Sequence, residues 1–309
     1  MPPKLSFGIM TLQNLPYASL VERWRQLDAL GWDSVWLGDH FVDPFSPDEP
    51  WYDGWTLLAA LATHTKRIRI GTLVSSITLR NPALLAKEAM TVDHVSQGRL
   101  ELGIGAAGRP LDHTMTGSDV WGSPERVQRF RESVEIVDRL LRQRVTTYAG
   151  RWYRTEEAVM NPGPLQQPRP PLTLAAHGPT TMRIAARYAD SWNSLGKLGA
   201  SADESLRATR ERNQQLDEYC AALGRDPHEI ERSLLCGFTP DRPFVSLDAF
   251  HEFVGRYRDV GIEEFIFYWL GDEGHPVFAD RGRKGVTITD RATLERVAMD
   301  AIPALRSGS

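Results

Sequence analysis

The amino-acid sequence predicts a (β/α)8 TIM barrel, and three observations support this fold class. Eight short runs of mostly apolar residues recur along the chain, as expected for parallel strands that are buried on both faces. Amphipathic segments that carry helix-capping residues separate these runs. The length of 309 residues fits a barrel of typical size, ~250 residues, with some insertions. We therefore expect a single domain that spans residues 1–309.

The expected elements follow one another in a regular order along the chain. Strands are predicted at residues 5–10, 34–38, 68–75, 100–105, 172–176, 191–195, 233–238 and 264–269. Capping residues, or a proline in the first turn, mark six helix starts: Ser19-x-x-Glu22, Asn81-Pro82, Ser123-Pro124, Ser201-x-x-Glu204, Ser246 and Asp290. Gly31 and Gly98 are positioned to end two of these helices.

Three connections are longer than a barrel requires, and all follow the C-terminal ends of strands, where barrel enzymes build their sites. The first begins at Phe41, the second spans residues 106–123, and the third spans residues 271–290. At this end of the barrel we predict a substrate pocket formed by Asn14, Trp51, Tyr52, Arg109, Trp121 and Trp269. The alternative is that the aromatic residues only cover the barrel.

A separate insertion at residues 145–171 precedes the fifth strand. It carries a hairpin-like segment at residues 148–153 and then a proline-rich return. Because it enters the barrel at the end opposite the long loops, we expect it to be structural cover.

Composition and charge exclude several classes of function. The chain has 36 Lys and Arg residues against 40 Asp and Glu residues, a net charge of −4, and no run rich in Lys or Arg. We therefore expect no nucleic-acid partner and no membrane partner. The N-terminal segment lacks a signal-peptide pattern, which predicts a cytoplasmic protein with Cys220 and Cys236 as reduced packing residues. The spacing of the eight histidines predicts no metal site.

Two glycine-rich segments compete as the binding site of an anionic cofactor. Residues 103–108 match the dinucleotide-binding pattern G-x-G-x-x-G, but Arg109-Pro110 follows where a helix should begin. Residues 177–181 instead follow the fifth strand directly and open a helix. Gly178 permits close backbone approach, and the free N–H groups of residues 180–182, with the helix dipole, favour a phosphate group. Such helix starts also occur without a ligand.

The ionisable pair Asp39-His40 stands where the second apolar strand meets a polar loop. In a barrel this edge faces the substrate, and histidine exchanges protons near neutral pH. Asp39 is a carboxylate that could fix the imidazole tautomer or hold a ligand. An isolated loop histidine, however, is more often an ordinary surface residue. Nothing in the sequence resembles an activated serine or cysteine with its base, which favours proton transfer beside hydride transfer.

These segments together resemble the luciferase-like flavin- or deazaflavin-dependent oxidoreductases, a family of (β/α)8 barrels, over nearly the full length. The resemblance is carried by DSVWLGDH at 33–40, GTLV at 71–74, RNP at 80–82, GRLELGIG at 98–105, AHGP at 176–179 and ADSWN at 189–193. It implies a homodimer and a non-prolyl cis peptide at Leu73, joined to Thr72 or Val74. It also implies cofactor contacts from Asp39, Leu73, Val74, Ala176, His177, Gly178, Pro179, Thr180 and Thr181.

The ending Asp39-His40 is similar to that of family members that use coenzyme F420. The resemblance therefore implies hydride transfer between F420 and a small organic substrate, with His40 handling the proton. FMN is the alternative cofactor and would imply an O2-dependent monooxygenase, with a separate flavin reductase as partner. A barrel that binds flavin without turnover is a third alternative. Pro44 and Gly108-Arg109 replace a tryptophan and a glutamate of the family's sugar-phosphate dehydrogenases, which argues against glucose 6-phosphate as substrate.

Overall fold

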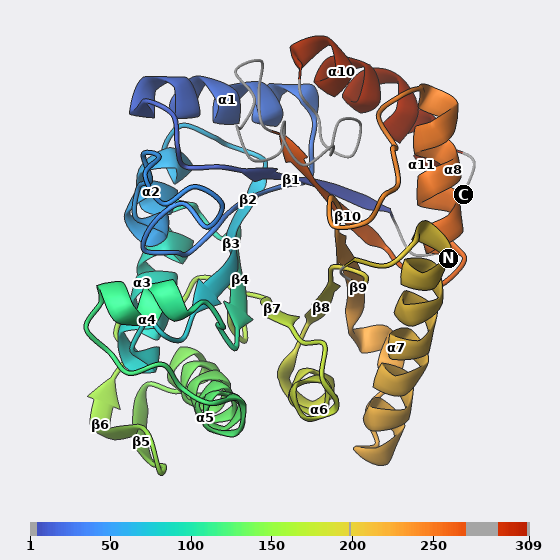
Figure 1. Cartoon of the computed structure of the whole chain (residues 1–309). Helices are drawn as coiled ribbons and strands as arrows, with labels where there is room; N and C mark the ends of the chain where they lie inside the picture. The colour runs from blue at the N-terminus through green and yellow to red at the C-terminus, as the bar shows by residue number, and fades with distance from the viewer. Residues whose placement is uncertain (1–4, 198, 270–289, 308–309) are drawn as a thin grey trace.

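The computed structural model describes residues 5–197, 199–269 and 290–307, and it contains the predicted barrel. Within these residues, eight parallel strands close in the order β1-β10-β9-β8-β7-β4-β3-β2 (Figure 1). They are β1 (Ser6–Thr11), β2 (Ser34–Leu37), β3 (Arg69–Ser76), β4 (Leu100–Gly105), β7 (Leu172–Ala175), β8 (Ser191–Ser194), β9 (Glu231–Leu235) and β10 (Glu264–Trp269). The fold class is confirmed. The largest shift is at β9, which ends at Leu235 rather than at residue 238.

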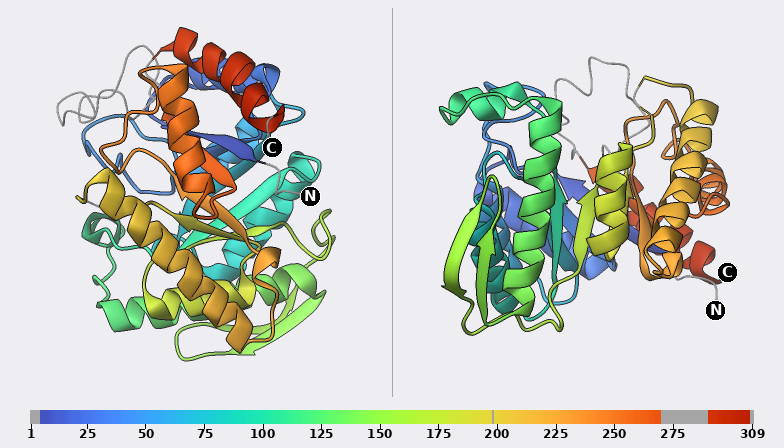
Figure 2. Two further views of the ribbon diagram at one scale, coloured as in Figure 1. Left: turned by 90° about the vertical axis from the view of Figure 1, so that its right-hand side faces the viewer. Right: turned by 90° about the horizontal axis from the view of Figure 1, so that it is seen from below.

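Helices surround the barrel as an outer layer (Figure 1, Figure 2). The longest bury one apolar side against the strands; in the helix at residues 123–142, Phe130, Val134, Val137 and Leu141 are buried. In the described part of the chain, no helix is both long and apolar enough to cross a membrane. The helices are α1 (Tyr17–Leu30), α2 (Gly54–Ala62), α3 (Pro82–Val95), α4 (Pro110–Met115), α5 (Ser123–Arg142), α6 (Pro179–Tyr188), α7 (Ala202–Ala222), α8 (Leu247–Arg258), α10 (Arg291–Arg296) and α11 (Ile302–Ser307), with the short 3-10 helix η1 (Pro227–Glu229) and the π-helix η2 (Val297–Ala301).

Most of the predicted helix boundaries are confirmed by the capping contacts. The side chains of four predicted caps accept a hydrogen bond from the first turn: Asn81, Ser201, Ser246 and Asp290. Gly31 ends α1 in the left-handed conformation, with φ of 89°. The predicted capping box Ser19-x-x-Glu22 is wrong, because α1 begins at Tyr17 after Pro16. The carbonyl of Pro16 already accepts hydrogen bonds from the first-turn N–H groups of residues 19 and 20.

The predicted hairpin within residues 145–171 is present as β5 (Val145–Ala149) and β6 (Arg154–Val159), which pair antiparallel. Its turn is fixed to α5, because the buried carboxylate of Glu132 accepts hydrogen bonds from the N–H groups of residues 151–153 at 2.9–3.1 Å. The guanidinium of Arg129 lies 4.3 Å from the Trp121 ring centroid and 4.1 Å from that of Trp152. The hairpin therefore covers α5, and its tip reaches the connection between α4 and α5 rather than staying at the opposite end.

The glycines at residues 103–108 serve strand packing. A Cβ atom on Gly103 would lie 1.9 Å from the carbonyl oxygen of Thr72, and one on Gly105 would lie 2.3 Å from Cγ2 of Val74. Strand β4 therefore needs glycine where it passes close to β3. The next helix, α4, begins only at Pro110 and has six residues. The closed barrel and these contacts exclude the Rossmann interpretation of this motif.

We expect Gly103→Ala to lower the free energy of unfolding by about 3 kcal/mol, because the added methyl group meets backbone that moves only if β3 shifts. Chemical denaturation monitored by circular dichroism measures this change. The matched control is Gly255→Ala in α8, where a Cβ atom meets nothing within 4 Å, and we expect no loss of stability there. A loss below about 1 kcal/mol for Gly103→Ala would contradict the close approach of β3 and β4.

Candidate active site

A cavity of about 710 Å³ opens at the C-terminal ends of the strands. Its volume lies within the range of small-molecule and cofactor sites, roughly 300–1,000 Å³. The lining comes from all eight barrel strands or the loops that follow them, together with the first turns of α5 and α6. Several predicted site residues are brought together here: Asp39, His40, Trp51, Leu73, Val74, Arg109, His177, Gly178 and Thr181.

Apolar side chains close the floor of this cavity. One cluster inside the barrel contains Met10, Leu12, Leu73, Leu235 and Tyr268, all of which line the cavity, above the buried Trp36 and Ile266. Successive side chains on a strand point to opposite faces, so Tyr268 of β10 faces the cavity and Trp269 faces outward. The guanidinium carbon of Arg23 lies 5.0 Å from the Trp269 ring centroid. The prediction of Trp269 as a pocket residue is therefore wrong by one position.

The other predicted residues also lie outside the cavity lining: Asn14, Tyr52, Trp121, Ala176, Pro179 and Thr180. Ala176 belongs to the core, because its neighbour Ala175 is the residue that faces the cavity. The Trp121 ring packs edge-on against His113, with 4.7 Å between the ring centroids, and so supports the loop after β4. Thr180 faces a separate groove on the outside of the barrel.

His40 is held by Asp112 of α4, a residue that the sequence analysis missed. Nδ1 of His40 lies 2.9 Å from Oδ2 of Asp112, and the N–H of Phe41 donates to Oδ1 at 3.0 Å. Burial raises the pKa of Asp112, but the hydrogen bonds from His40 and Phe41 outweigh burial and leave the pKa below its usual value. With Nδ1 occupied, Nε2 of His40 is the nitrogen left for a ligand. The sequence offered one indication of this role, because Asp112 lies in the long connection after the fourth strand, where the site was expected.

Asp39 has a different environment from the one expected. Its carboxylate accepts hydrogen bonds from Arg80, with Nη2–Oδ1 at 2.8 Å and Nε–Oδ2 at 3.2 Å. Oδ2 also accepts from the N–H of Ser76 at 3.0 Å, and the side chain is only 1% exposed. Asp39 therefore connects the ends of β2 and β3, and Asp112 rather than Asp39 contacts the imidazole of His40.

Leu73 and Val74 form one wall of the cavity at the end of β3. The peptide bond between them is cis, as the family resemblance implied. Gly105 on β4 leaves the space that the Val74 side chain occupies. The result is an apolar surface against which a planar ring system can pack.

The beginning of α6, which follows β7, forms another end of the cavity. The N–H of Gly178 donates to Oγ1 of Thr181 at 3.2 Å, and the N–H of Met182 donates to the carbonyl of Gly178 at 2.9 Å. Met182 is therefore not the free donor that we expected. The N–H groups of Thr180 and Thr181 remain at the open end of the helix, where the helix dipole favours an anion.

Arg126 of α5 brings positive charge to the same end and is the second residue that the sequence analysis missed. It lines the cavity together with Gly178 and Thr181, and its Nε atom is buried without a hydrogen-bond partner in the described structure. A ligand anion would satisfy this donor. The sequence offered one indication of Arg126, because it lies in the first turn of α5, directly after the long connection that follows the fourth strand.

His177 is the other unsatisfied group at this end of the cavity, since its Nε2 atom is also buried without a partner among the described residues. Burial, and secondarily the charge of Arg212, lowers the pKa of His177 to about 4. The imidazole is therefore neutral near pH 7 and can offer a hydrogen bond without adding charge. In the described ranges, no three His, Cys, Asp or Glu side chains gather as a metal site would require.

Comparison with curated proteins identifies relatives that use two kinds of cofactor. The F420-dependent glucose-6-phosphate dehydrogenase of Intrasporangium calvum is 32% identical over 234 residues, which cover 72% of this chain and 66% of that protein. The match thus spans just under two thirds of this relative's length. The flavin-dependent trigonelline monooxygenase, oxygenase component, of Acinetobacter baylyi is 30% identical over 174 residues, which cover 55% of this chain and 46% of that protein.

Solved structures and a family pattern agree with this fold. The coenzyme F420-dependent tetrahydromethanopterin reductase from Methanopyrus kandleri superposes with a TM-score of 0.74, covering 97% of this chain and 99% of that one. At 15% identity, this likeness supports the fold alone. Residues 5–241 match the pattern of the family described as "Luciferase-like monooxygenase". The resemblance noted in the sequence is therefore confirmed, and the chain belongs to the luciferase-like monooxygenase family.

Proposed function

We propose that this protein is an oxidoreductase that transfers a hydride between coenzyme F420 and a small organic substrate, with His40 as the catalytic residue that handles the proton. One observation carries the proposal: a single cavity combines a histidine held by Asp112 with an anion-binding end at Gly178, Thr181 and Arg126. The F420-dependent relative supports the choice of cofactor.

The residues of the cavity fit a phosphorylated deazaflavin. The unpartnered Nε of Arg126, with the N–H groups of Thr180 and Thr181, would bind the phosphate. Leu73 and Val74 would back the ring system. When bound, the cofactor supplies or accepts the hydride.

We assign the proton transfer to His40. Its Nδ1 is held by Asp112, so Nε2 is free to give a proton to, or take one from, the reacting group of the substrate. Because the Asp112 carboxylate stays ionised, it holds the orientation of the imidazole ring. We therefore assign Asp112 as a positioning residue.

For the substrate, we propose an uncharged and largely apolar organic compound. The floor of the cavity away from α6 is apolar, with Met10, Leu235 and Tyr268 among its lining residues. Arg109, at the position where a glutamate of the sugar-phosphate dehydrogenases was expected, lies with its guanidinium carbon 5.9 Å from the Phe45 ring centroid. The replacement of that glutamate by Gly108-Arg109, and of a tryptophan by Pro44, is the difference that argues against glucose 6-phosphate, for which the Intrasporangium relative is named.

We expect the purified protein to bind F420 more tightly than FMN in fluorescence titrations at matched salt. Tighter binding of FMN, together with flavin-dependent O2 consumption and product formation, would favour the alternative, an FMNH2-dependent monooxygenase supplied by a separate flavin reductase. The flavin-dependent relative is the precedent for that alternative. Tight binding of either cofactor without turnover of any substrate would indicate a non-catalytic flavin-binding barrel.

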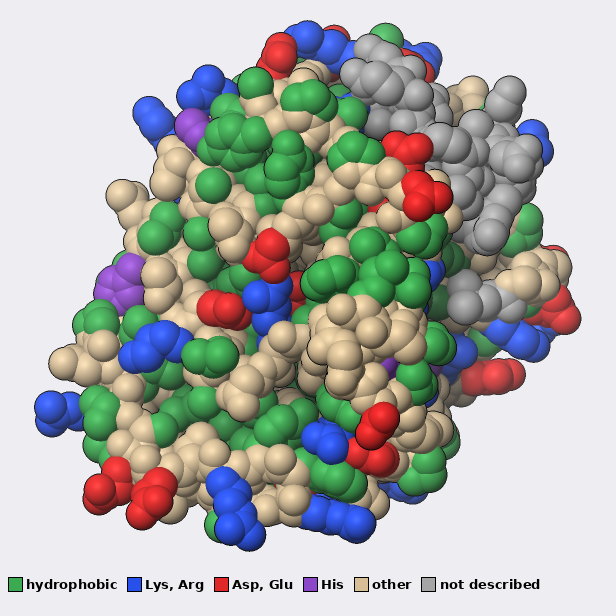
Figure 3. Space-filling model, turned by 60° about the vertical axis from the view of Figure 1, so that its left-hand side comes forward, with side chains coloured by type: hydrophobic (Ala, Val, Ile, Leu, Met, Phe, Trp, Pro, Cys, Tyr) green, Lys and Arg blue, Asp and Glu red, His purple; other side chains and the backbone are tan. Residues whose placement is uncertain are grey.

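We further propose that the protein is a cytoplasmic homodimer. Both cysteines, Cys220 and Cys236, are free and buried, which suits a reducing compartment. The side of the molecule shown in Figure 3 carries patches of apolar side chains between charged ones. Large exposed side chains in the described structure include Leu84 at 64% and Val159 at 55% exposure. Light scattering on the purified protein tests the dimer.

A further inference from the structure

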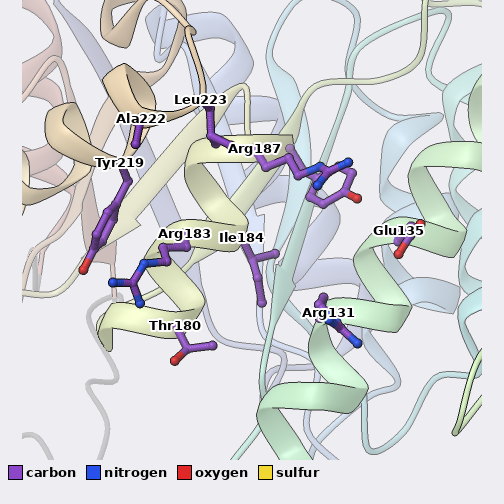
Figure 4. Close-up of a pocket in the computed structure, with 10 residues that line it drawn as sticks. Arg131, Glu135, Thr180, Arg183, Ile184, Arg187, Tyr219, Ala222 and Leu223 are labelled. Carbon is purple, nitrogen blue, oxygen red and sulfur yellow. The ribbon is translucent and has the colours of Figure 1, made fainter.

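A groove on the outside of the barrel adjoins the anion-binding end of the cavity. It has a volume of about 400 Å³ and lies between α5, α6 and α7 (Figure 4). Thr180 lines this groove, whereas the next residue, Thr181, lines the cavity. Residues 178–180 are exposed, so the first turn of α6 is a rim that the two sites share. A ligand whose phosphate binds at this turn can therefore continue into the groove.

The groove carries a cluster of positive charge. Arg131 of α5 and Arg183 and Arg187 of α6 line it, and all three are exposed. Within the described residues, none of the three forms an ion pair. The guanidinium carbon of Arg183 lies 4.6 Å from the Tyr219 ring centroid, and that of Arg187 lies 5.4 Å from the ring centroid of the adjacent tyrosine. These two arginines stack on aromatic rings, and their guanidinium groups donate no hydrogen bond to the part of the chain that the structure describes.

The acidic residue of the lining does not neutralise this cluster. Glu135 lines the groove from α5, but its carboxylate pairs with Arg139, one turn further along the same helix. The described lining therefore contains three uncompensated arginines and no free carboxylate. This arrangement favours an anionic ligand.

The arginines follow one another along the axis of α6. Thr180, Arg183 and Arg187 are three and four residues apart, so their backbone positions share one side of α6. Figure 4 shows the side chain of Arg183 extending toward Tyr219 of α7 and that of Arg187 extending toward α5, which carries Arg131. At 1.5 Å per residue, the distance along the axis from Thr180 to Arg187 is about 10 Å. A row of charges of this length suits an extended chain with several carboxylates better than a single phosphate.

We propose that this groove binds the oligoglutamate tail of coenzyme F420. The tail extends beyond the phosphate of the cofactor, and each glutamate adds a carboxylate that a guanidinium can bind through charge-assisted hydrogen bonds. The inference rests on the proposed function, because FMN ends at its phosphate and has no tail. An acidic segment of another protein is the competing occupant.

The test compares two forms of F420, one without glutamates and one with several, in fluorescence titrations. We expect the wild-type protein to bind the long-tailed form about tenfold more tightly at low salt, and this gain should shrink as salt is raised. In the triple variant Arg131→Gln, Arg183→Gln, Arg187→Gln, both forms should bind equally, with the affinity for the tail-less form unchanged. Arg258→Gln, an exposed arginine on α8, is the control and should keep the full preference.

Two results would overturn the proposed tail site but leave the proposed cofactor standing. One is equal binding of both forms by the wild-type protein, and the other is a preference for the long-tailed form that remains in the triple variant. Failure of both forms to bind would instead overturn the proposed cofactor together with the tail site. Circular dichroism melting of the triple variant separates loss of the tail contacts from loss of folding. If the triple variant melts early, each single variant is titrated instead, and each should lose part of the tenfold preference.

Discussion

Replacing His40 with alanine should lower kcat by roughly 100- to 10,000-fold, the usual contribution of a general acid or base, while the Kd of the cofactor changes only a few-fold. The physical reason is that proton transfer would use Nε2 of the imidazole, whereas the phosphate of the cofactor would bind at different residues of the cavity, Gly178, Thr181 and Arg126. Steady-state kinetics and fluorescence titration of the same variant measure the two quantities. Near-normal turnover would reduce His40 to a structural role.

Asp112→Asn is the companion variant, because asparagine keeps the size of the side chain and removes its charge. If Asp112 positions His40, kcat should fall by a smaller factor than in His40→Ala, and the pH profile of kcat/KM should change. Asp112 also accepts the N–H of Phe41, so the melting temperature of the variant is measured in parallel. A loss of stability with an unchanged pH profile would show that Asp112 only supports its loop.

Gly178→Val is expected to weaken binding of the phosphorylated cofactor by at least about 30-fold, or roughly 2 kcal/mol. Valine would place two methyl groups at the rim of α6, where the phosphate must approach the N–H groups of Thr180 and Thr181. The fold itself has room, since a Cβ atom on Gly178 meets only Oγ1 of Thr181, at 3.8 Å, and φ is −94°. Isothermal titration calorimetry measures the loss.

A deazaflavin analogue without phosphate is the control ligand for Gly178→Val, and its affinity should hardly change. Gly178→Ala is the control variant, with a smaller loss because it adds a single methyl group. Equal losses for both ligands would show general damage to the barrel. An unchanged affinity for the phosphorylated cofactor would move the phosphate toward the side chains of Arg126 and Arg109, which line the cavity nearby.

The fold could be predicted because its signals are local. Buried parallel strands need apolar runs on both faces, and helix ends need caps, so the runs at the eight barrel strands and the caps at Asn81, Ser201 and Ser246 were visible in the sequence. The same holds for residues that leave a strand at the C-terminal edge, such as His40 and His177, which both line the cavity. The start of α1 was misplaced because Ser19-x-x-Glu22 satisfied the sequence pattern while Pro16 provided the actual first turn.

By itself, the sequence determined the barrel, the edge that carries the site, and the candidates His40 and Gly178. The tertiary structure alone decided which groups meet. Asp112 reaches His40 across 72 positions of the chain, Asp39 pairs with Arg80 across 41, and Arg126 lines the same cavity as Gly178 and Thr181. Strand alternation also decided that Tyr268, not Trp269, faces the cavity. The long-range contacts form only when the barrel closes. The direction of a strand side chain changes from one residue to the next, and composition and periodicity do not show which of two adjacent residues faces the cavity.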